Sequence, residues 1–231
     1  MKKKIDSLSV VMSVKNGEKF LGKAIESILN QSFNNFEFII VNNDSSDSTP
    51  EILSAYADKD SRIKVLKNSN NETLYAGRIK GIKETKYEWF ALMDADDECH
   101  LDRIQKQIEL INNTEIENLA VVSTYGKYIN RNSTVIANFF SGPKNINEFN
   151  KIFLNNDSFA IIDPSSVIKK NIFLKIGGYL ENNVAADLDL YYKVAKVRFL
   201  MQTIASPLYY YRIHGRRYGA QNNVKQHVFE L

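Results

Sequence analysis

The chain has 231 residues, 44% of them hydrophobic and 25% charged, which is ordinary for a globular protein with one large domain. Its 30 Lys and Arg against 27 Asp and Glu give a net charge of +3, too small to argue for a nucleic-acid partner. The single Cys99 excludes an internal disulfide, and no stretch approaches the roughly 18 apolar residues of a transmembrane helix.

The first 41 residues alternate strand and helix patterns. Residues 8–14 are rich in Val and predict a strand that ends before the breaker Asn16-Gly17. A stripe of apolar side chains at helical spacing predicts a helix over 18–30, and 36–41 predicts a second strand. This order predicts a right-handed βαβ unit with parallel strands.

A polar turn follows the second strand, over residues 42–49. Thr49 is the expected N-cap of a helix over 51–58, with Pro50 at its first helical position. Asn, Asp and Ser are also ordinary turn formers, so this turn alone does not separate a ligand site from a simple connection.

The next helix carries a basic residue of interest. Residues 62–66 predict a third strand, and Thr73 is expected to cap a helix over 74–84. Arg78 on that helix could neutralise a diphosphate, pair with Asp94, or lie in solvent. The side chains expected to face the sheet are Leu74, Ala76, Ile79 and Ile82.

A carboxylate cluster ends the fourth predicted strand. The apolar residues 89–93 have the length of a strand buried on both faces, and Asp94, Asp96 and Asp97 follow. Charges cannot enter the core, so these carboxylates should emerge at the strand end, where they suit Mg²⁺ or Mn²⁺. The alternative is that they only begin a turn before the helix predicted after Asp102.

Polar clusters therefore follow three strands, at residues 14–16, 41–47 and 93–97. In a doubly wound sheet these strand ends lie side by side, where ligands bind. The coincidence predicts a nucleotide-plus-metal site.

The pattern changes after Asn113. Strands are expected over residues 119–125, 135–140 and 199–204, on both sides of Pro164 within 159–168, and helices over 145–154, 171–176 and 187–197. Gly177-Gly178 should stop the second of these helices. The expected apolar face of the last helix is Leu188, Tyr191, Tyr192 and Ala195. This half is mixed α+β, and no linker separates it from the first.

Several motifs in fixed order resemble the family 2 glycosyltransferases with the GT-A fold. The resemblance runs from Leu8 to about Arg217, and the motifs are residues 9–18, 27–32, 38–47, 94–97, 175–179 and 211–214. It implies an α/β GT-A fold, Rossmann-like, with a mostly parallel central sheet, flanking helices and a mixed α+β acceptor-side extension. The expected organisation is a single domain over 1–231, with a nucleotide-sugar half (1–113) and an acceptor and catalytic-base half (114–231).

The resemblance also implies an activity. Such enzymes move a sugar from a nucleotide-diphosphate sugar, here a UDP-sugar, to an acceptor hydroxyl with inversion, using Mn²⁺ or Mg²⁺. The implied acceptor is a glycan or lipid-linked glycan of bacterial surface polysaccharide synthesis. The implied location is the cytoplasm, with peripheral association with the inner face of the membrane left open.

Site residues are carried over by the same resemblance. Asp187 is the expected catalytic base and Asp189 its reserve, while Asp94, Asp96 and His214 are the expected metal residues. The residues expected around the donor and its nucleotide are Ser13, Lys15, Asn16, Glu18, Asn43, Asp44, Arg78, Asp94, Ala95, Asp96 and His214.

The chain departs from the family pattern at several of these positions. Asn43 and Asp44 replace an Asp and a Gly, Ala186 replaces a Glu beside the base, and Asp163 stands where the family often has His. A catalytically silent nucleotide-binding or scaffold protein is therefore the alternative. A nucleotidyltransferase would need a Gly-rich basic loop after the first strand, and residues 15–18 lack one.

Overall fold

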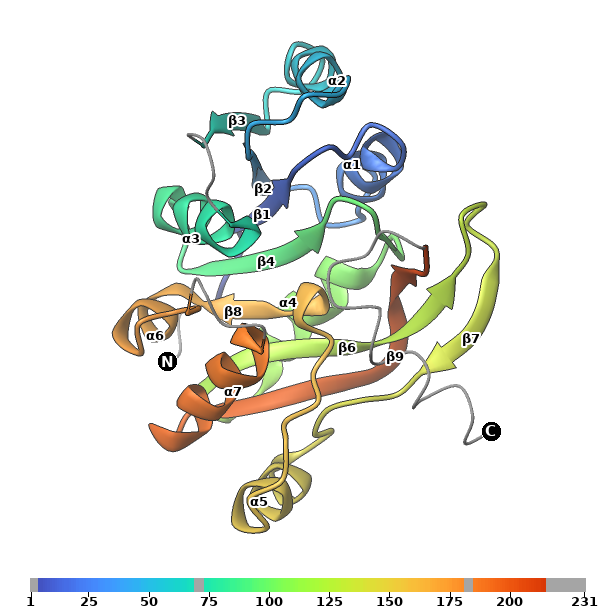
Figure 1. The fold of residues 1–231 in the computed structure, drawn as a ribbon. Helices are drawn as coiled ribbons and strands as arrows, with labels where there is room; N and C mark the ends of the chain where they lie inside the picture. The colour runs from blue at the N-terminus through green and yellow to red at the C-terminus, as the bar shows by residue number, and fades with distance from the viewer. Residues whose placement is uncertain (1–3, 69–72, 181–184, 215–231) are drawn as a thin grey trace.

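A computed structural model describes residues 4–68, 73–180 and 185–214 (Figure 1). The last residues of the predicted resemblance, 215–217, lie outside this part. The first half contains β1 (Leu8–Val14), α1 (Leu21–Leu29), β2 (Phe36–Asn42), α2 (Thr49–Ala57), β3 (Ile63–Lys67), α3 (Leu74–Glu84), β4 (Trp89–Asp94), β5 (Glu98–Cys99) and α4 (Arg103–Asn113). The second half contains β6 (Leu119–Ile129), β7 (Val135–Phe139), α5 (Ile146–Leu154), the 3-10 turn η1 (Asp163–Ser165), β8 (Val167–Lys169), α6 (Lys170–Lys175), α7 (Ala186–Lys196) and β9 (Leu200–Arg212).

One nine-stranded sheet runs through both halves, in the order β3-β2-β1-β4-β8-β6-β9-β5, with β7 paired to β6. The strands β3, β2, β1 and β4 are parallel, as predicted. In these ladders Val14 pairs with Asn42 and Ser13 with Asp94, so the three polar strand ends do lie side by side. β8 is antiparallel to β4 and to β6, and β5 returns to pair with β9.

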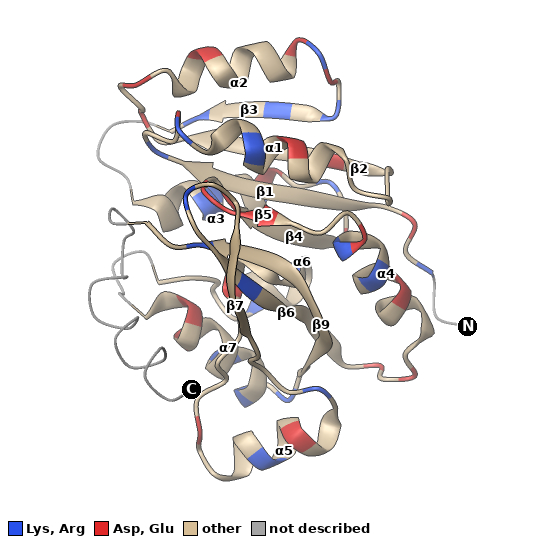
Figure 2. Cartoon of the chain, turned by 90° about the vertical axis from the view of Figure 1, so that its right-hand side faces the viewer, with Lys and Arg blue, Asp and Glu red and all other residues tan. Residues whose placement is uncertain are grey.

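Helices cover both faces of the sheet, because the buried strands are apolar on both sides. Along β1, Val10 and Met12 pack in one buried cluster with α1 and α4, whereas Val11 packs in a second cluster with α3, α6 and α7. Figure 1 shows α3, α6 and α7 together on that second face. α1, α4 and α5 each carry residues of both charge signs (Figure 2). No described helix is long and apolar enough to cross a membrane.

α3 lies unusually close to the sheet, and this corrects the predicted face of that helix. Leu74 is exposed, and the residues buried against the strands are Gly77, Gly81 and Ile82. A Cβ atom at Gly77 would lie 2.2 Å from Asn43 Oδ1, and one at Gly81 would lie 2.7 Å from a methyl of Val11. The glycines thus bring Arg78 close to the strand ends.

Other predicted elements needed adjustment in the second half. The segment before Pro164 is not a strand but leads into η1, which contains this proline. β6 and β9 run further than predicted, to Ile129 and Arg212, because they pair with each other along most of their length. In α7 the buried residues are Ala186, Leu190, Tyr191, Val194 and Ala195, whereas Leu188 and Tyr192 are exposed.

Three predicted helix ends can be compared with the structure. Thr73 caps α3 by accepting a hydrogen bond from Ala76 N, as predicted. Thr49 is not the N-cap of α2, which is Ser48; its hydroxyl instead accepts from Gly17 N at 2.9 Å and ties the turn after β1 to α2. Gly177 and Gly178 both have positive φ and close α6, as predicted.

Candidate functional site

The turns after β1 and β2 are joined by reciprocal hydrogen bonds. Asn16 N donates to Ser45 Oγ and Asn16 Oδ1 accepts from Ser46 N, both at 2.9 Å. Glu18 N donates to Asp47 Oδ2 while the Glu18 carboxylate accepts from Ser48 N, both at 3.1 Å. Two of the predicted nucleotide residues, Asn16 and Glu18, thus also shape the rim of the site.

Asn43 points into the protein rather than into solvent. It is 3% exposed; its Nδ2 donates to Ser13 Oγ at 2.7 Å, and its Oδ1 accepts from Asn68 Nδ2 at 3.0 Å. Ser13 Oγ in turn donates to Leu74 O. Ser13 and Asn43 therefore hold β1, β2 and α3 in register. The predicted residues in these two turns with exposed side chains are Lys15, Asn16, Glu18 and Asp44.

The carboxylates of Asp94, Asp96 and Asp97 each offer an oxygen within 4.8 Å of the others. Their environments differ. Asp97 is fully buried; it accepts from Tyr209 OH and from Arg212 N, both at 2.8 Å. Asp97 thus fastens β9 to the end of β4. The side chains of Asp94 and Asp96 are 27% and 28% exposed and can meet a ligand.

Arg78 bridges two carboxylates. One Nη donates to Asp94, and Nη1 donates to Asp163 Oδ2 at 2.7 Å. Its burial opposes ionisation, but the charges of Asp94 and Asp163 prevail and hold the Arg78 pKa well above its ordinary value. Of the predicted alternatives for Arg78, the structure shows the pair with Asp94.

His214 and Asp96 are 118 positions apart in sequence and adjacent in space. His214 Nε2 lies 2.7 Å from Asp96 Oδ2, and the imidazole ring packs 5.1 Å from the ring of Phe20. Ala95 is half-buried between the two carboxylates. The mutually close set among the described residues is Asp94, Asp96 and Asp97, and His214 lies against Asp96. Carboxylate oxygens are the donors that Mg²⁺ and Mn²⁺ prefer, so the partly exposed Asp94 and Asp96 are of the residue type that could hold such a cation.

Asp163 is a member of the site for which sequence reasoning gave no role. It is 6% exposed and accepts from Tyr179 OH at 2.8 Å, from Tyr191 OH at 2.6 Å and from Arg78. Burial raises the pKa of Asp163, and the charge of Asp187 adds to this while Arg78 opposes it. The available signal was a lone carboxylate in the apolar stretch 159–164, which implies buried partners.

The two tyrosines keep their protons for this network. Burial, and then the negative charge of Asp163, raises the pKa of Tyr179 and Tyr191 well above the ordinary value. Both hydroxyls therefore remain donors to Asp163. Because Tyr191 lies on α7 and Arg78 on α3, the contacts of Asp163 link these two helices.

Asp187 occupies the first turn of α7 and is partly exposed. Its charge contributes to raising the pKa of both Asp163 and Tyr75, which places it in the same network. Ala186, which replaces the family Glu, is fully buried in the core cluster of that face. Asp189 forms an ion pair with Lys193 at 2.6 Å, so the reserve base already has a cationic partner.

The chain is similar in sequence to known proteins over most of its length. The model of the family described as "Glycosyl transferase family 2" matches residues 9–177. The chain is 31% identical over 212 residues to the "Uncharacterized glycosyltransferase MJ1057" of Methanocaldococcus jannaschii (90% of this chain, 71% of that protein). It is 29% identical over 220 residues to the "O-antigen biosynthesis glycosyltransferase WbnJ" of Escherichia coli (92% and 82%). A third relative, "UDP-Glc:alpha-D-GlcNAc-diphosphoundecaprenol beta-1,3-glucosyltransferase WfgD" of Escherichia coli, is 26% identical over 210 residues (86% and 79%).

Solved structures share the fold at lower identity. S. aureus TarS 1-349 in complex with UDP-GlcNAc has a TM-score of 0.73 at 18% identity, covering 92% of this chain and 60% of that one. The mannosyltransferase PcManGT from Pyrobaculum calidifontis, in complex with GDP-Man and Mn²⁺, has a TM-score of 0.70 at 13% identity (94% and 59%). The chain thus spans about 60% of the solved TarS chain. The GT-A fold predicted from sequence is confirmed.

Proposed function

This chain belongs to glycosyl transferase family 2, and we propose that it transfers a sugar from a UDP-sugar to a glycan or lipid-linked glycan acceptor, with inversion and with a divalent cation. The observation that carries the proposal is the cluster of Asp94, Asp96 and Asp97 at the carboxyl edge of the sheet, with His214 against Asp96. Arg78 and Asp163 connect this cluster to the helix of Asp187.

The departure of a nucleoside diphosphate leaves charge that must be stabilised. Asp94, Asp96 and His214 would hold Mn²⁺ or Mg²⁺, which when bound supplies positive charge beside the diphosphate. Arg78 keeps Asp94 in place and offsets the repulsion between the two exposed carboxylates. Asn43 and Ser13 fix β1, β2 and α3 beneath this site through their buried hydrogen bonds. The exposed turn residues Lys15 and Asp44 would border the nucleotide.

Asp187 would act as the general base. It accepts the proton of the acceptor hydroxyl while that oxygen bonds to the anomeric carbon and the bond from this carbon to the diphosphate oxygen breaks. Attack from the face opposite the leaving group inverts the anomeric centre. Asp163 and Tyr191 hold α7, and therefore Asp187, against Arg78.

Names of relatives support the finer assignments. WbnJ is named for O-antigen biosynthesis and WfgD for a UDP-glucose donor and a lipid-linked acceptor. TarS was solved with UDP-GlcNAc, and PcManGT with Mn²⁺. We extend the proposal to a single domain over 1–231 that acts in the cytoplasm at the inner face of the membrane. The sheet pairs β4 with β8 and β5 with β9, which joins the two halves.

The experiment is a UDP-release assay with UDP-glucose and UDP-N-acetylglucosamine, each with Mn²⁺ or with EDTA, and with a polyprenyl-diphosphate-linked N-acetylglucosamine acceptor. We expect release that needs both metal and acceptor. Metal-dependent UDP binding without release from any donor would instead support the silent nucleotide-binding protein, an alternative that the burial of Ala186 in place of a Glu favours.

A further inference from the structure

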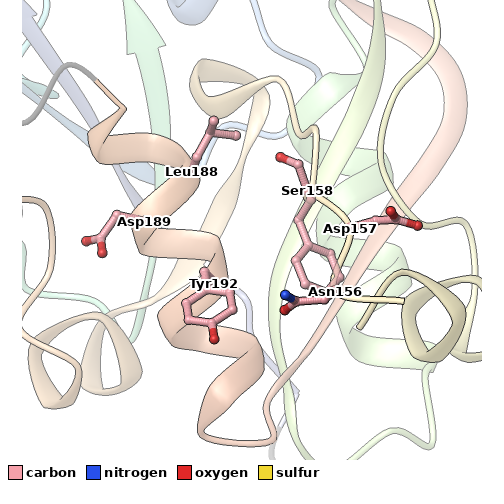
Figure 3. Close-up of a pocket in the computed structure, with 7 residues that line it drawn as sticks. Asn156, Asp157, Ser158, Leu188, Asp189 and Tyr192 are labelled. Carbon is pink, nitrogen blue, oxygen red and sulfur yellow. The ribbon is translucent and has the colours of Figure 1, made fainter. Parts of the chain in front are cut away.

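A pocket in the second half of the chain opens on a different side of α7 from Asp187. It has a volume of about 410 Å³ and lies between α7 and the segment that follows α5 (Figure 3). Its wall includes Leu188, Asp189 and Tyr192, which lie about 100–200° around the helix from Asp187. The part of the second half that reaches the carboxylate cluster is instead the end of β9.

Arg212, the last residue of β9, is fully buried and holds the turn that carries the carboxylates. Its backbone N–H donates to Asp97 Oδ1, and its Nε donates to the backbone oxygen of Asp96, both at 2.8 Å. Hydrogen bonds in a buried setting are electrostatically stronger than in water. The peptide from which the Asp96 side chain extends is therefore held in one position by Arg212.

The remaining donors of Arg212 fix the direction in which its guanidinium points. Nη1 donates to the backbone oxygen of Asn130 at 2.7 Å, and Nη2 donates to the Glu98 carboxylate. Ser133 Oγ lies 3.3 Å from both Nη atoms. The guanidinium presents its N–H groups in a rigid planar fork, whereas a lysine ammonium is a compact point charge. A lysine here would keep the charge but lose the set of hydrogen bonds that aims Nε at Asp96.

The Phe20 ring connects Arg212 to His214. The guanidinium carbon of Arg212 lies 4.6 Å from the centre of this ring, and the imidazole of His214 lies 5.1 Å from the same centre. His214 follows Arg212 by two residues, and its Nε2 lies 2.7 Å from Asp96 Oδ2. Arg212 thus contacts Asp96 directly and His214 through a shared aromatic neighbour.

We propose that Arg212 is a positioning residue for the divalent cation, because it holds Asp96 and His214 in the arrangement that receives the ion. The inference rests on the proposed function and deepens it. Asp96 and His214 come from opposite ends of the described chain, and Arg212 is the side chain through which the end of β9 grips the Asp96 backbone. Arg212 itself does not touch the ion or the substrates.

The test is a titration with MnCl₂, with and without UDP, in which the free Mn²⁺ is measured by electron paramagnetic resonance. We compare the wild type with Arg212→Lys and record the melting temperature of each metal-free protein. Loss of a residue that orients a metal ligand typically costs 10–100-fold in metal affinity. We expect the Mn²⁺ Kd of Arg212→Lys to be about tenfold weaker. A merely structural role would lower the melting temperature and leave the Kd of the folded protein unchanged.

Arg62→Lys is the matched control. Arg62 makes the same kinds of contact as Arg212: it pairs with Asp60, donates to the backbone oxygen of Leu29, and lies 4.5 Å from the centre of the Phe36 ring. It directly precedes β3, at the opposite end of that strand from the polar turns. We expect a lower melting temperature in this variant and a Mn²⁺ Kd equal to that of the wild type.

Phe20→Leu tests the same link while leaving the hydrogen bonds of Arg212 in place. Leucine keeps an apolar side chain at this buried position but lacks the ring that Arg212 and His214 share. We expect the Mn²⁺ Kd to weaken by about threefold, in line with the loss of a cation–π contact. This variant decides the question if Arg212→Lys does not fold.

Each outcome decides the inference. A Mn²⁺ Kd equal to that of the wild type in folded Arg212→Lys, or in Phe20→Leu if the first variant does not fold, would overturn it. An equal weakening in Arg62→Lys would do the same, because the effect would then not depend on the end of β9. Failure of the proposed function is distinguishable, since the wild type itself would then bind no Mn²⁺ with or without UDP.

Discussion

Asp96 and Asp97 are neighbours in sequence with opposite environments. The side chain of Asp96 is partly exposed beside His214, whereas Asp97 is fully buried between Tyr209 and the backbone of Arg212. The same contrast holds between Asp187, which is partly exposed, and Asp163, which is buried among Arg78 and two tyrosines. The partly exposed member of each pair can still contact a ligand, and the buried member holds the elements that carry it.

The largest effect is expected for Asp187, the partly exposed member of the second pair. Asp187→Asn keeps the size of the side chain but removes its ability to take a proton. General bases contribute about 10²–10⁴-fold, so kcat should fall by about 10³-fold with little change in donor affinity. Initial rates and a UDP titration of the variant measure both quantities. Loss of UDP binding would show that Asp187 has another role.

Asp163→Asn tests the buried partner. The change removes the charge that pairs with Arg78, so the free energy of unfolding should fall by about 3 kcal/mol, typical of a broken buried ion pair. Chemical denaturation measures this, with Asp187→Asn as the matched substitution that should leave stability nearly unchanged. A stability equal to that of the wild type would contradict the role given to Asp163. If Asp163 also positions α7, kcat falls more than the donor KM rises.

Asp97→Asn and Asp96→Asn make the same comparison at the end of β4. An amide has one carbonyl oxygen for the two donors that Asp97 now satisfies, Tyr209 OH and Arg212 N. The unfolding free energy should fall by about 2 kcal/mol for Asp97→Asn and by less than about 0.5 kcal/mol for Asp96→Asn. If urea denaturation gave the same loss of unfolding free energy for both variants, burial would not account for the different roles of Asp96 and Asp97.

The smallest expected effect belongs to an ion pair outside the site. Hydrogen bonds from Arg62 lower the Asp60 pKa below its ordinary value of 3.8. A lowered carboxyl pKa contributes stability above the ordinary value, and this contribution is lost as pH falls through the folded-state pKa. Asp60→Asn should therefore cost about 0.5 kcal/mol at pH 7 and progressively less as the pH falls below 3.8, measured by denaturation over a series of pH values. A cost independent of pH would show that charge is not its cause.

Features that depend on short-range sequence patterns were predicted correctly. The parallel order of the first strands, the meeting of their polar ends, the Thr73 cap and the Gly177-Gly178 stop were all predicted. The fold and the membership of glycosyltransferase family 2 are likewise confirmed. These features depend on short-range patterns and on motif order.

Side-chain orientations that depend on tertiary packing could not be predicted from the sequence. Residues 94–97 do not reveal that Asp97 turns inward, because its partners Tyr209 and Arg212 come from β9, more than a hundred residues later. Leu74 was predicted to face the sheet, but Gly77 and Gly81 occupy that face of α3, so Leu74 points to solvent. The partners of Asp163 come from α3, from α7 and from the segment that follows α6.

The most direct measurement of the central claim is a thermal-shift panel of UDP, dTDP, GDP and CDP, each with and without Mn²⁺, on the wild type and on Asp96→Ala. We expect stabilisation by UDP only when Mn²⁺ is present, and its loss in Asp96→Ala without a change in the melting temperature of the free protein. An equal Mn²⁺-dependent UDP shift in both proteins, or no shift with any nucleotide, would contradict a metal-and-nucleotide site at the end of β4.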